Sequence, residues 1–138
     1  MSRHDQDSKR RIALSKSDLG KLKALVETAK KYLRRDYIDQ LDEKLEEAEV
    51  VSPGMVPNDE VEIDKFVRIT DLDRSEERVY KLVLPRDANF GNHISVIAPL
   101  GAALLGSHTG DVIEVIAPGR IRKIRVEEIL NGSNKFAA

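Results

Sequence analysis

The first third of the chain carries two adjoining stretches in which apolar residues recur every three or four positions. In the first stretch these residues are Leu19, Leu22, Val26, Ala29 and Leu33, and in the second they are Ile38, Leu41, Leu45 and Ala48. Such spacings place the residues on one face of a helix and are typical of the seam of a short coiled coil. The pattern therefore predicts two amphipathic helices that pack through this seam.

Local signals indicate where both helices begin. Ser15 to Asp18 matches the acidic form of a capping box, which would begin the first helix. Asp36 is expected to cap the second helix, with Asp39 in its first turn near the positive end of the helix dipole.

The second helix is expected to end by Val50 or Val51, because Ser52-Pro53-Gly54 breaks it. Only Leu33 to Asp36 links the helices, so they must fold back antiparallel. We call residues 14–51 the arm and expect it to project from the protein, with a first helix roughly 28 Å long. Residues 1–13 are expected to form a disordered start.

After a linker at residues 52–60 the helical pattern gives way to extended and alternating segments. We expect extended chain from residue 61, a strand over 78–84, a short strand over 94–98, and strands over 112–116 and 120–130. The sequence predicts a short apolar helix at Pro99 to Leu105, followed by Gly106. The fold class is therefore α+β, with a helical hairpin followed by a compact sheet domain at residues 61–130 and a frayed tail at 131–138.

Composition narrows the class of protein. The 138 residues include 23 basic and 24 acidic side chains, so the net charge of −1 excludes a uniformly basic nucleic-acid binder. The absence of cysteine excludes disulfide scaffolds, zinc fingers and thiol catalysis. No apolar run reaches the ~20 residues of a membrane span, and the polar start lacks a signal-peptide core. We expect a cytoplasmic protein without a membrane partner.

Charge is nevertheless unevenly distributed along the chain. Lys9 to Arg35 carries ten basic against two acidic residues, and Asp36 to Glu49 carries seven acidic residues against Lys44. A basic helix should therefore lie against an acidic one. The basic run Arg120 to Arg125 fits a phosphate backbone or an acidic partner, but we favour the solvated face of an edge strand.

Candidate chemistry is sparse. None of the histidines, His4, His93 and His108, has helical ligand spacing with another, and we interpret them as loop residues. Asp36 and Asp39 lie three residues apart at the exposed arm tip and could hold Mg²⁺. Helix capping is the favoured interpretation, so we predict neither a metal site nor a cofactor.

Several motifs resemble those of the GreA/GreB family of bacterial transcript-cleavage factors. They are Val51-Ser52-Pro53, Pro57-Asn58-Asp59-Glu60-Val61, Gly110-Asp111 and the long run from Ser95 to Gly106. The resemblance covers roughly residues 14–130. Within the family, the short-armed regulator of nucleoside diphosphate kinase is the more similar group.

The resemblance implies an FKBP-like domain, an antiparallel sheet with one short helix. It also implies binding to bacterial RNA polymerase, whose secondary channel receives the arm. It further implies that Ile97, Ala98 and Pro99 contact the polymerase, and we call these three residues the docking corner. The residues alone predict that the docking corner is a partly exposed turn between a strand and a helix. The arm tip, Arg34, Arg35, Asp36 and Asp39, does not match the family's metal-holding acids residue by residue.

We therefore expect a non-catalytic regulator that binds the polymerase, competes with cleavage factors and does not bind nucleic acid strongly by itself. The alternative is a cleavage cofactor in which Asp36 and Asp39 help hold Mg²⁺ in the polymerase active site. A peptidyl-prolyl isomerase, the other enzyme that the fold suggests, is disfavoured because the domain has few aromatic residues to line a pocket.

Overall fold

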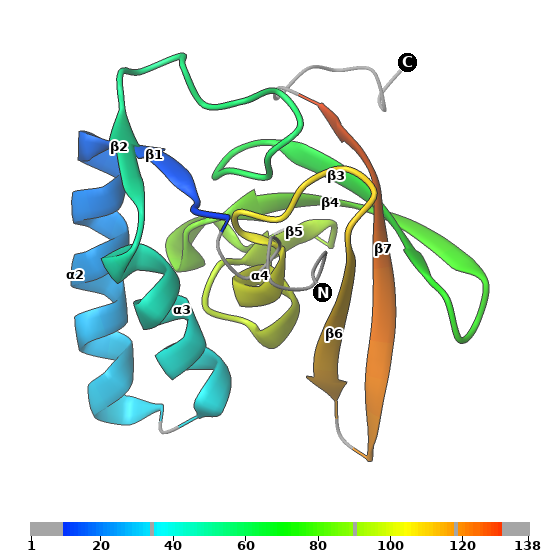
Figure 1. Ribbon diagram of the computed structural model, residues 1–138. Coiled ribbons are helices and arrows are strands. Elements are labelled where there is room, and N and C mark those ends of the chain that lie inside the picture. The colour runs from blue at the N-terminus through cyan, green and yellow to red at the C-terminus, as the bar shows by residue number, and fades with distance from the viewer. Residues whose placement is uncertain (1–9, 34, 90, 118, 131–138) are drawn as a thin grey trace.

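The computed structural model describes residues 10–33, 35–89, 91–117 and 119–130. Two helices stand beside a curled sheet that encloses a third, short helix (Figure 1). The helices are α2 (Lys16–Tyr32), α3 (Asp36–Glu46) and α4 (Pro99–Leu104), with a 3-10 turn η1 at Pro85–Asp87. The strands are β1 (Ala13–Ser15), β2 (Glu49–Val51), β3 (Phe66–Asp71), β4 (Glu76–Val83), β5 (His93–Ser95), β6 (Val112–Ala117) and β7 (Arg120–Leu130). The α+β class and the helical hairpin are confirmed.

The hairpin closes through the predicted seam. Leu22, Val26, Ile38, Leu41 and Leu45 are all almost fully buried. Its first cap is also confirmed, since the Ser15 hydroxyl oxygen accepts a hydrogen bond from the Asp18 N–H at 3.2 Å. Sequence periodicity and local capping together therefore account for both helices.

Two expectations about the second helix are wrong. The N-cap residue of α3 is Arg35, without a side-chain cap bond, and Asp36 is already in the first turn. The helix ends at Glu46, and residues 49–51 form β2, which pairs in parallel with β1. This pairing competes successfully with helix extension because Val50 and Val51 are β-branched and the Ala13–Ser15 backbone lies alongside.

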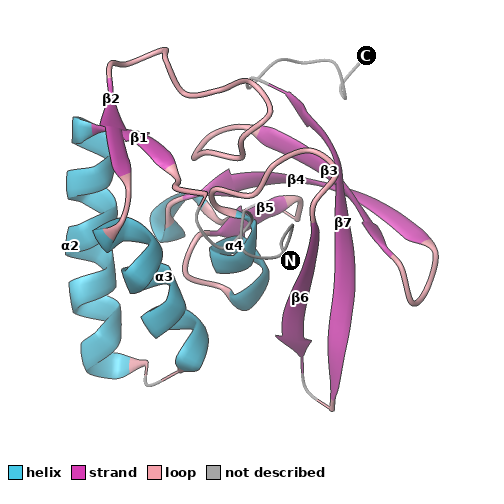
Figure 2. Ribbon diagram, viewed as in Figure 1, coloured by secondary structure: helices cyan, strands magenta, loops and turns pink. Residues whose placement is uncertain are grey.

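The larger sheet has the strand order β5-β4-β3-β7-β6 (Figure 2). Its pairs are antiparallel except β4 with β5, which run parallel, so the sheet is mixed rather than wholly antiparallel. The prediction that Arg120 to Arg125 lies on an edge strand is wrong for the strand as a whole, because β7 lies between β3 and β6, although residues 120–122 pair with β6 and not with β3. The register between β3 and β7 shifts between Arg68 and Ile69, where β7 contains one extra residue, Glu127.

The arm and the sheet share one hydrophobic core. Leu22 and Leu41 from the helices belong to the same buried cluster as Ile69, Leu104 and Ile124 from the sheet domain. The expectation of an arm that projects freely is therefore wrong at its base, where α3 packs on α4. The seam leucines are buried against the sheet domain as well as against each other.

The chain before the arm is also part of this fold. Ile12 and Ala13 are buried, although they were assigned to a disordered start; residues 1–9, including His4, lie outside the described residues, as does the expected tail at 131–138. At the other end of the arm, Glu60, assigned to the linker, is almost fully buried. None of the described helices is long and apolar enough to span a membrane.

Candidate functional site

The docking corner is the turn between β5 and α4. Ile97 and Ala98 are half-buried, and Pro99 is exposed as the first residue of α4. Ser95 forms the turn: its hydroxyl oxygen accepts the Ile97 N–H at 3.1 Å, and its carbonyl oxygen accepts the Ala98 N–H at 3.0 Å. The sequence-based description of a partly exposed strand-to-helix corner is confirmed.

Gly101 lets α4 approach this turn. A Cβ atom at position 101 would lie 1.9 Å from the Ser95 carbonyl oxygen, far inside van der Waals contact. The backbone of Ser95 has little freedom to move away, because β5 pairs with β4. The glycine is thus required for the close approach that gives the corner its shape.

The arm tip exposes its charges. Asp36 and Asp39 are exposed in the first turn of α3, and neither forms a hydrogen bond or ion pair with a described residue. Arg35 is exposed beside them, whereas Arg34 lies outside the described residues. The sequence reasoning overlooked Tyr32, whose side chain is 79% exposed at this end of α2. The tip therefore offers an aromatic ring as well as charges to a partner.

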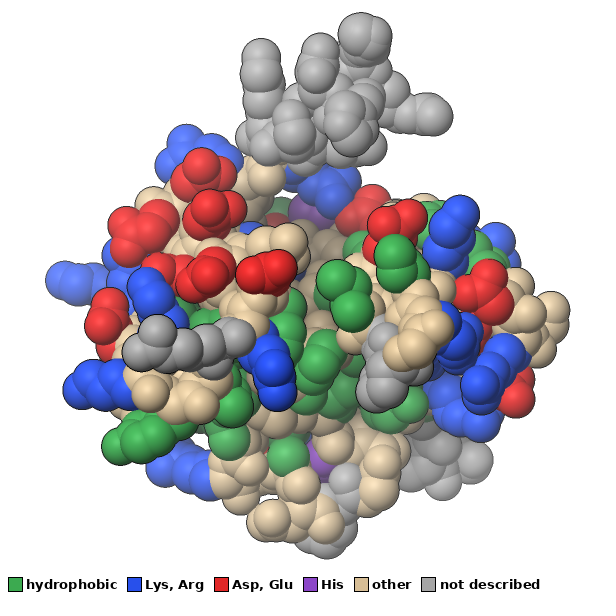
Figure 3. Space-filling view, turned by 90° about the horizontal axis from the view of Figure 1, so that it is seen from below, with side chains coloured by type: hydrophobic (Ala, Val, Ile, Leu, Met, Phe, Trp, Pro, Cys, Tyr) green, Lys and Arg blue, Asp and Glu red, His purple; other side chains and the backbone are tan. Residues whose placement is uncertain are grey.

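The charge runs follow the two helices. Figure 3 shows acidic side chains gathered over the helical side of the molecule, with hydrophobic side chains surfacing towards the middle of this face. Between the helices, one ion pair joins described residues, Lys30 to Asp42 at 2.8 Å. The opposite charges therefore face solvent along most of the arm. Within the described ranges, no three His, Cys, Asp or Glu side chains come together as a metal site.

The basic run on β7 has acidic partners within the chain. The Asp71 carboxylate lies 3.1 Å from Nε of Arg122 and 3.7 Å from the guanidinium of Arg120. Asp71 also accepts the backbone N–H groups of Asp73 and Arg74. Arg120 and Arg122 therefore hold the β3–β4 turn against β7, and the Asp71 carboxylate partly neutralises their positive charge.

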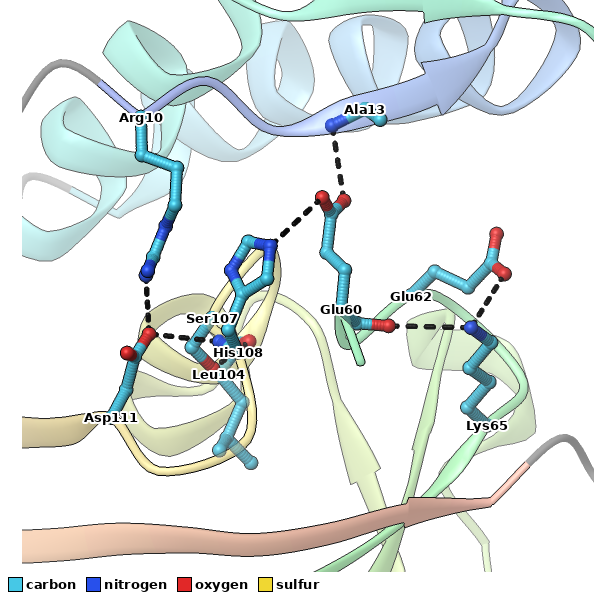
Figure 4. A network of polar contacts seen from close by, with 9 residues as sticks. All are labelled: Arg10, Ala13, Glu60, Glu62, Lys65, Leu104, Ser107, His108 and Asp111. Carbon is cyan, nitrogen blue, oxygen red and sulfur yellow. Dashed lines mark hydrogen bonds and ion pairs between the residues drawn. The ribbon is translucent and has the colours of Figure 1, made fainter. Parts of the chain in front are cut away.

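A buried polar network connects the start of the chain to the sheet domain (Figure 4). One carboxylate oxygen of Glu60 accepts the Ala13 N–H at 3.0 Å, and the other lies 3.7 Å from His108 Nε2. Burial raises the pKa of Glu60 to about 7, and burial lowers the pKa of His108. Arg10 forms an ion pair with Asp111, which also accepts the His108 backbone N–H at 2.8 Å.

Lys65 completes the other side of this network. It is buried, and its ammonium lies 3.1 Å from the Glu62 carboxylate and 3.3 Å from the Glu60 carbonyl oxygen. Sequence reasoning missed the network because its members come from the start, the linker and a turn. The one available signal was Glu60 within the motif Pro57 to Val61.

A second polar contact joins the arm to α4. The Lys44 ammonium donates hydrogen bonds to the carbonyl oxygens of Ala102 and Leu105, both at 2.8 Å, and lies 3.4 Å from that of Ala103. Burial lowers the pKa of Lys44 to about 8. In the sequence, Lys44 was distinctive only as the single cation among seven acidic residues.

Comparisons with known proteins agree with this arrangement. Residues 56–131 match the family described as "Transcription elongation factor, GreA/GreB, C-term". A solved structure, "Prokaryotic transcription elongation factor GreA/GreB from Nitrosomonas europaea", superimposes with a TM-score of 0.73 at 35% identity, covering 88% of this chain and 98% of that one.

Curated relatives give the same result from sequence. Transcription elongation factor GreA of Thermotoga neapolitana is 36% identical over 95 residues, which are 68% of this chain and 60% of that protein. GreA of Clostridium botulinum (strain Eklund 17B / Type B) is 36% identical over 94 residues, or 67% and 59% of the two chains. The chain thus spans about 60% of the length of these curated relatives. From the family match and the shared fold, it belongs to the GreA/GreB family of transcription elongation factors.

Proposed function

We propose that this protein is a non-catalytic regulator that binds bacterial RNA polymerase at its secondary channel and competes there with transcript-cleavage factors. The observation that carries the proposal is the combination of a rigid, partly exposed docking corner with a short helical arm on one folded unit. Family membership supports the choice of partner, and the geometry of this chain supports the proposed mode of action.

The docking corner suits a protein partner. Ile97, Ala98 and Pro99 present apolar surface that is already held by Ser95 and by the close approach of Gly101. A preorganised apolar corner binds without ordering a loop, which would otherwise cost affinity. A charge placed at its centre would meet the partner without a counter-charge.

The arm suits entry into a narrow channel. Two antiparallel helices are a thin structure, and α2, with 17 residues, is about 25 Å long. The exposed Tyr32 and the charged residues Arg35, Asp36 and Asp39 lie at the end of this hairpin. The arm would obstruct the channel with this tip.

The tip is poorly arranged to stimulate cleavage. A carboxylate must approach Mg²⁺ to about 2 Å, so an arm that falls short of the active site cannot deliver it. Arg35, beside Asp36, also competes with a metal ion for the carboxylates. We therefore propose no metal or other cofactor of the protein's own and no strong direct binding to nucleic acid.

One observation favours the alternative function, a cofactor of transcript cleavage. Asp36 and Asp39 lie on one exposed turn and form no hydrogen bond or ion pair with described residues, so both carboxylates are available.

In the proposed function the protein acts in the cytoplasm as a short-armed regulator. A further relationship to the regulator of nucleoside diphosphate kinase stays a prediction.

Binding can be tested with Ala98→Asp. We expect its affinity for RNA polymerase to fall by at least about 100-fold, because a desolvated charge at an interface costs several kcal/mol. Ser75→Asp is the matched control, since it adds the same charge at an exposed turn between β3 and β4. Equal affinity of folded Ala98→Asp and wild-type protein would refute the docking corner.

The mode of action can be tested with a backtracked elongation complex and Mg²⁺. The proposed regulator should leave cleavage of the RNA 3′ end unstimulated and should inhibit a transcript-cleavage factor in proportion to occupancy. Stimulated cleavage that disappears in the Asp36→Ala, Asp39→Ala variant would establish the alternative instead.

A further inference from the structure

We propose that Lys44 is a positioning residue that fixes the direction of the arm relative to the docking corner. The inference rests on the proposed function, in which the corner binds the polymerase and the arm enters the channel. It concerns a residue that touches neither the corner nor the tip.

The contact is made at the base of the arm. Lys44 lies in the last turn of α3, and its ammonium reaches across to α4, where the carbonyl oxygens of Ala102 and Leu105 each accept a hydrogen bond at 2.8 Å. The third carbonyl oxygen, of Ala103, lies at 3.4 Å. The three carbonyls are at the carboxyl end of α4, whose six residues are Pro99 to Leu104.

The electrostatics explain why a cation is required there. The last carbonyl groups of a helix have no partner within the helix and carry partial negative charge. An ammonium with three N–H donors satisfies several of them at once. No carboxylate of the described residues forms an ion pair with Lys44, so these carbonyls are its main compensation for burial.

Lys44 lies between the docking corner and the arm tip. The amino end of α4 is the docking corner at Pro99, and the opposite end of α3 is the arm tip at Asp36. At ~1.5 Å per residue, α4 is roughly 9 Å long, so Lys44 acts close to the corner. A corner fixed on a partner therefore fixes α4, and Lys44 transmits that orientation to α3.

The other polar contacts at the base of the arm act elsewhere. Glu60 holds the Ala13 backbone, and Arg10 pairs with Asp111; both fasten the segment before α2. Apolar packing attaches α3 to α4, and the hydrogen bonds of Lys44 add a preferred direction, because they weaken as the donor–acceptor angle departs from its optimum. Among the described residues, Lys44 makes the polar contact that joins α3 directly to α4.

The arm direction can be measured directly in the full chain. The chain has no native cysteine, so Thr28→Cys on α2 and Arg74→Cys in the β3–β4 turn, both exposed positions, accept spin labels specifically. We expect a narrow distance distribution in the otherwise wild-type protein. Lys44→Met should broaden it at least about twofold, because the helices keep their apolar contact and lose the directed bonds.

Control variants distinguish a change in the direction of the arm from a loss of folding. Lys30→Met removes a cation of the same arm that pairs with Asp42 on its exposed surface, and it should leave the distribution unchanged. Lys44→Arg, which keeps a cationic donor, should restore most of the narrow distribution, and Lys44→Gln replaces Lys44→Met if that variant fails to fold. An unchanged distribution in a folded Lys44→Met or Lys44→Gln protein would overturn the proposal.

Polymerase measurements then distinguish the two proposals. Lys44→Met should bind RNA polymerase about tenfold more weakly than the wild type and compete correspondingly less with a transcript-cleavage factor, because a corner and an arm of variable direction engage the partner together less often. Normal binding together with normal competition would refute the role of Lys44 alone. If the wild-type chain does not bind polymerase at all, the proposed function fails, and the functional role of Lys44 fails with it.

Discussion

The charged side chains at the tip of the arm and those at its base have different surroundings. At the arm tip, Asp36 and Asp39 are exposed and form no bond with a described residue. At the base of the arm, Glu60 is almost fully buried and Lys44 is half-buried, and each is held by hydrogen bonds to backbone groups. The tip is suited to contact with a partner, whereas the base determines the shape that the partner meets.

The variant with the largest expected effect on stability tests whether the arm and the sheet unfold together. Leu41 is 1% exposed, and Leu41→Ala should lower the free energy of unfolding by about 3–4 kcal/mol through lost burial and a cavity. Because one core joins the helices to the sheet, hydrogen exchange should accelerate in both.

The matched control is Ile121→Ala, which removes aliphatic atoms from a side chain that is 55% exposed and should change stability little. Accelerated exchange confined to α2 and α3 would show instead that the arm is an independent module. The base would then be a simple attachment rather than part of the core.

Much of the arm could be predicted because its signals are local. The seam residues Leu22 and Leu41 repeat at helical spacing, and Ser15 with Asp18 forms a cap within three residues. The short helix at Pro99 is likewise indicated by neighbouring residues. The docking role of Ile97 to Pro99 was expected from the family resemblance of the run Ser95 to Gly106, whereas the residues alone predicted only a strand-to-helix corner.

The base of the arm could not be predicted because its contacts are between distant residues. Ala13 meets Glu60 across 47 positions and Lys44 meets Ala102 across 58. A single glutamate in a linker or a single lysine in an acidic helix has no periodic pattern to reveal burial. The three-residue strands β1 and β2 are similarly too short to be recognised before their partner is known.

The next largest effect on stability is expected at the base of the arm, and it depends on pH. Burial raises the pKa of Glu60 from 4.5 to about 7, so the folded protein holds a proton that the unfolded chain has released between these values. The stability contributed by this proton is full below pH 4.5 and is lost as pH rises towards 7. Relative to wild type, Glu60→Gln should therefore gain on the order of 2 kcal/mol of stability by pH 8.

The difference between variants reports Glu60 together with its neighbour His108. His108 has a lowered pKa and contributes in the opposite sense, gaining stability as pH rises towards 6.5, and its Nε2 lies 3.7 Å from the carboxylate that Glu60→Gln removes. The side-chain amide introduced by Glu60→Gln keeps an oxygen that can accept the Ala13 N–H. Denaturant unfolding from pH 5 to pH 8 gives the comparison, with exposed Glu114→Gln as the control. Parallel stability curves for wild type and Glu60→Gln would contradict the assignment.

The smallest effect is expected at the tip, where the proposed function assigns the charges to contact with a partner rather than to folding. Asp36→Asn and Asp39→Asn together remove two carboxylates from the first turn of α3, where they interact favourably with the helix dipole. Because both side chains are exposed, the double variant should lose less than about 1 kcal/mol of stability. The loss should also shrink in high salt, since exposed charges are screened. Thermal unfolding at low and high ionic strength measures both quantities. A loss comparable with that of Leu41→Ala, or one insensitive to salt, would mean that the tip carboxylates have a structural role, and the contrast between tip and base would no longer hold.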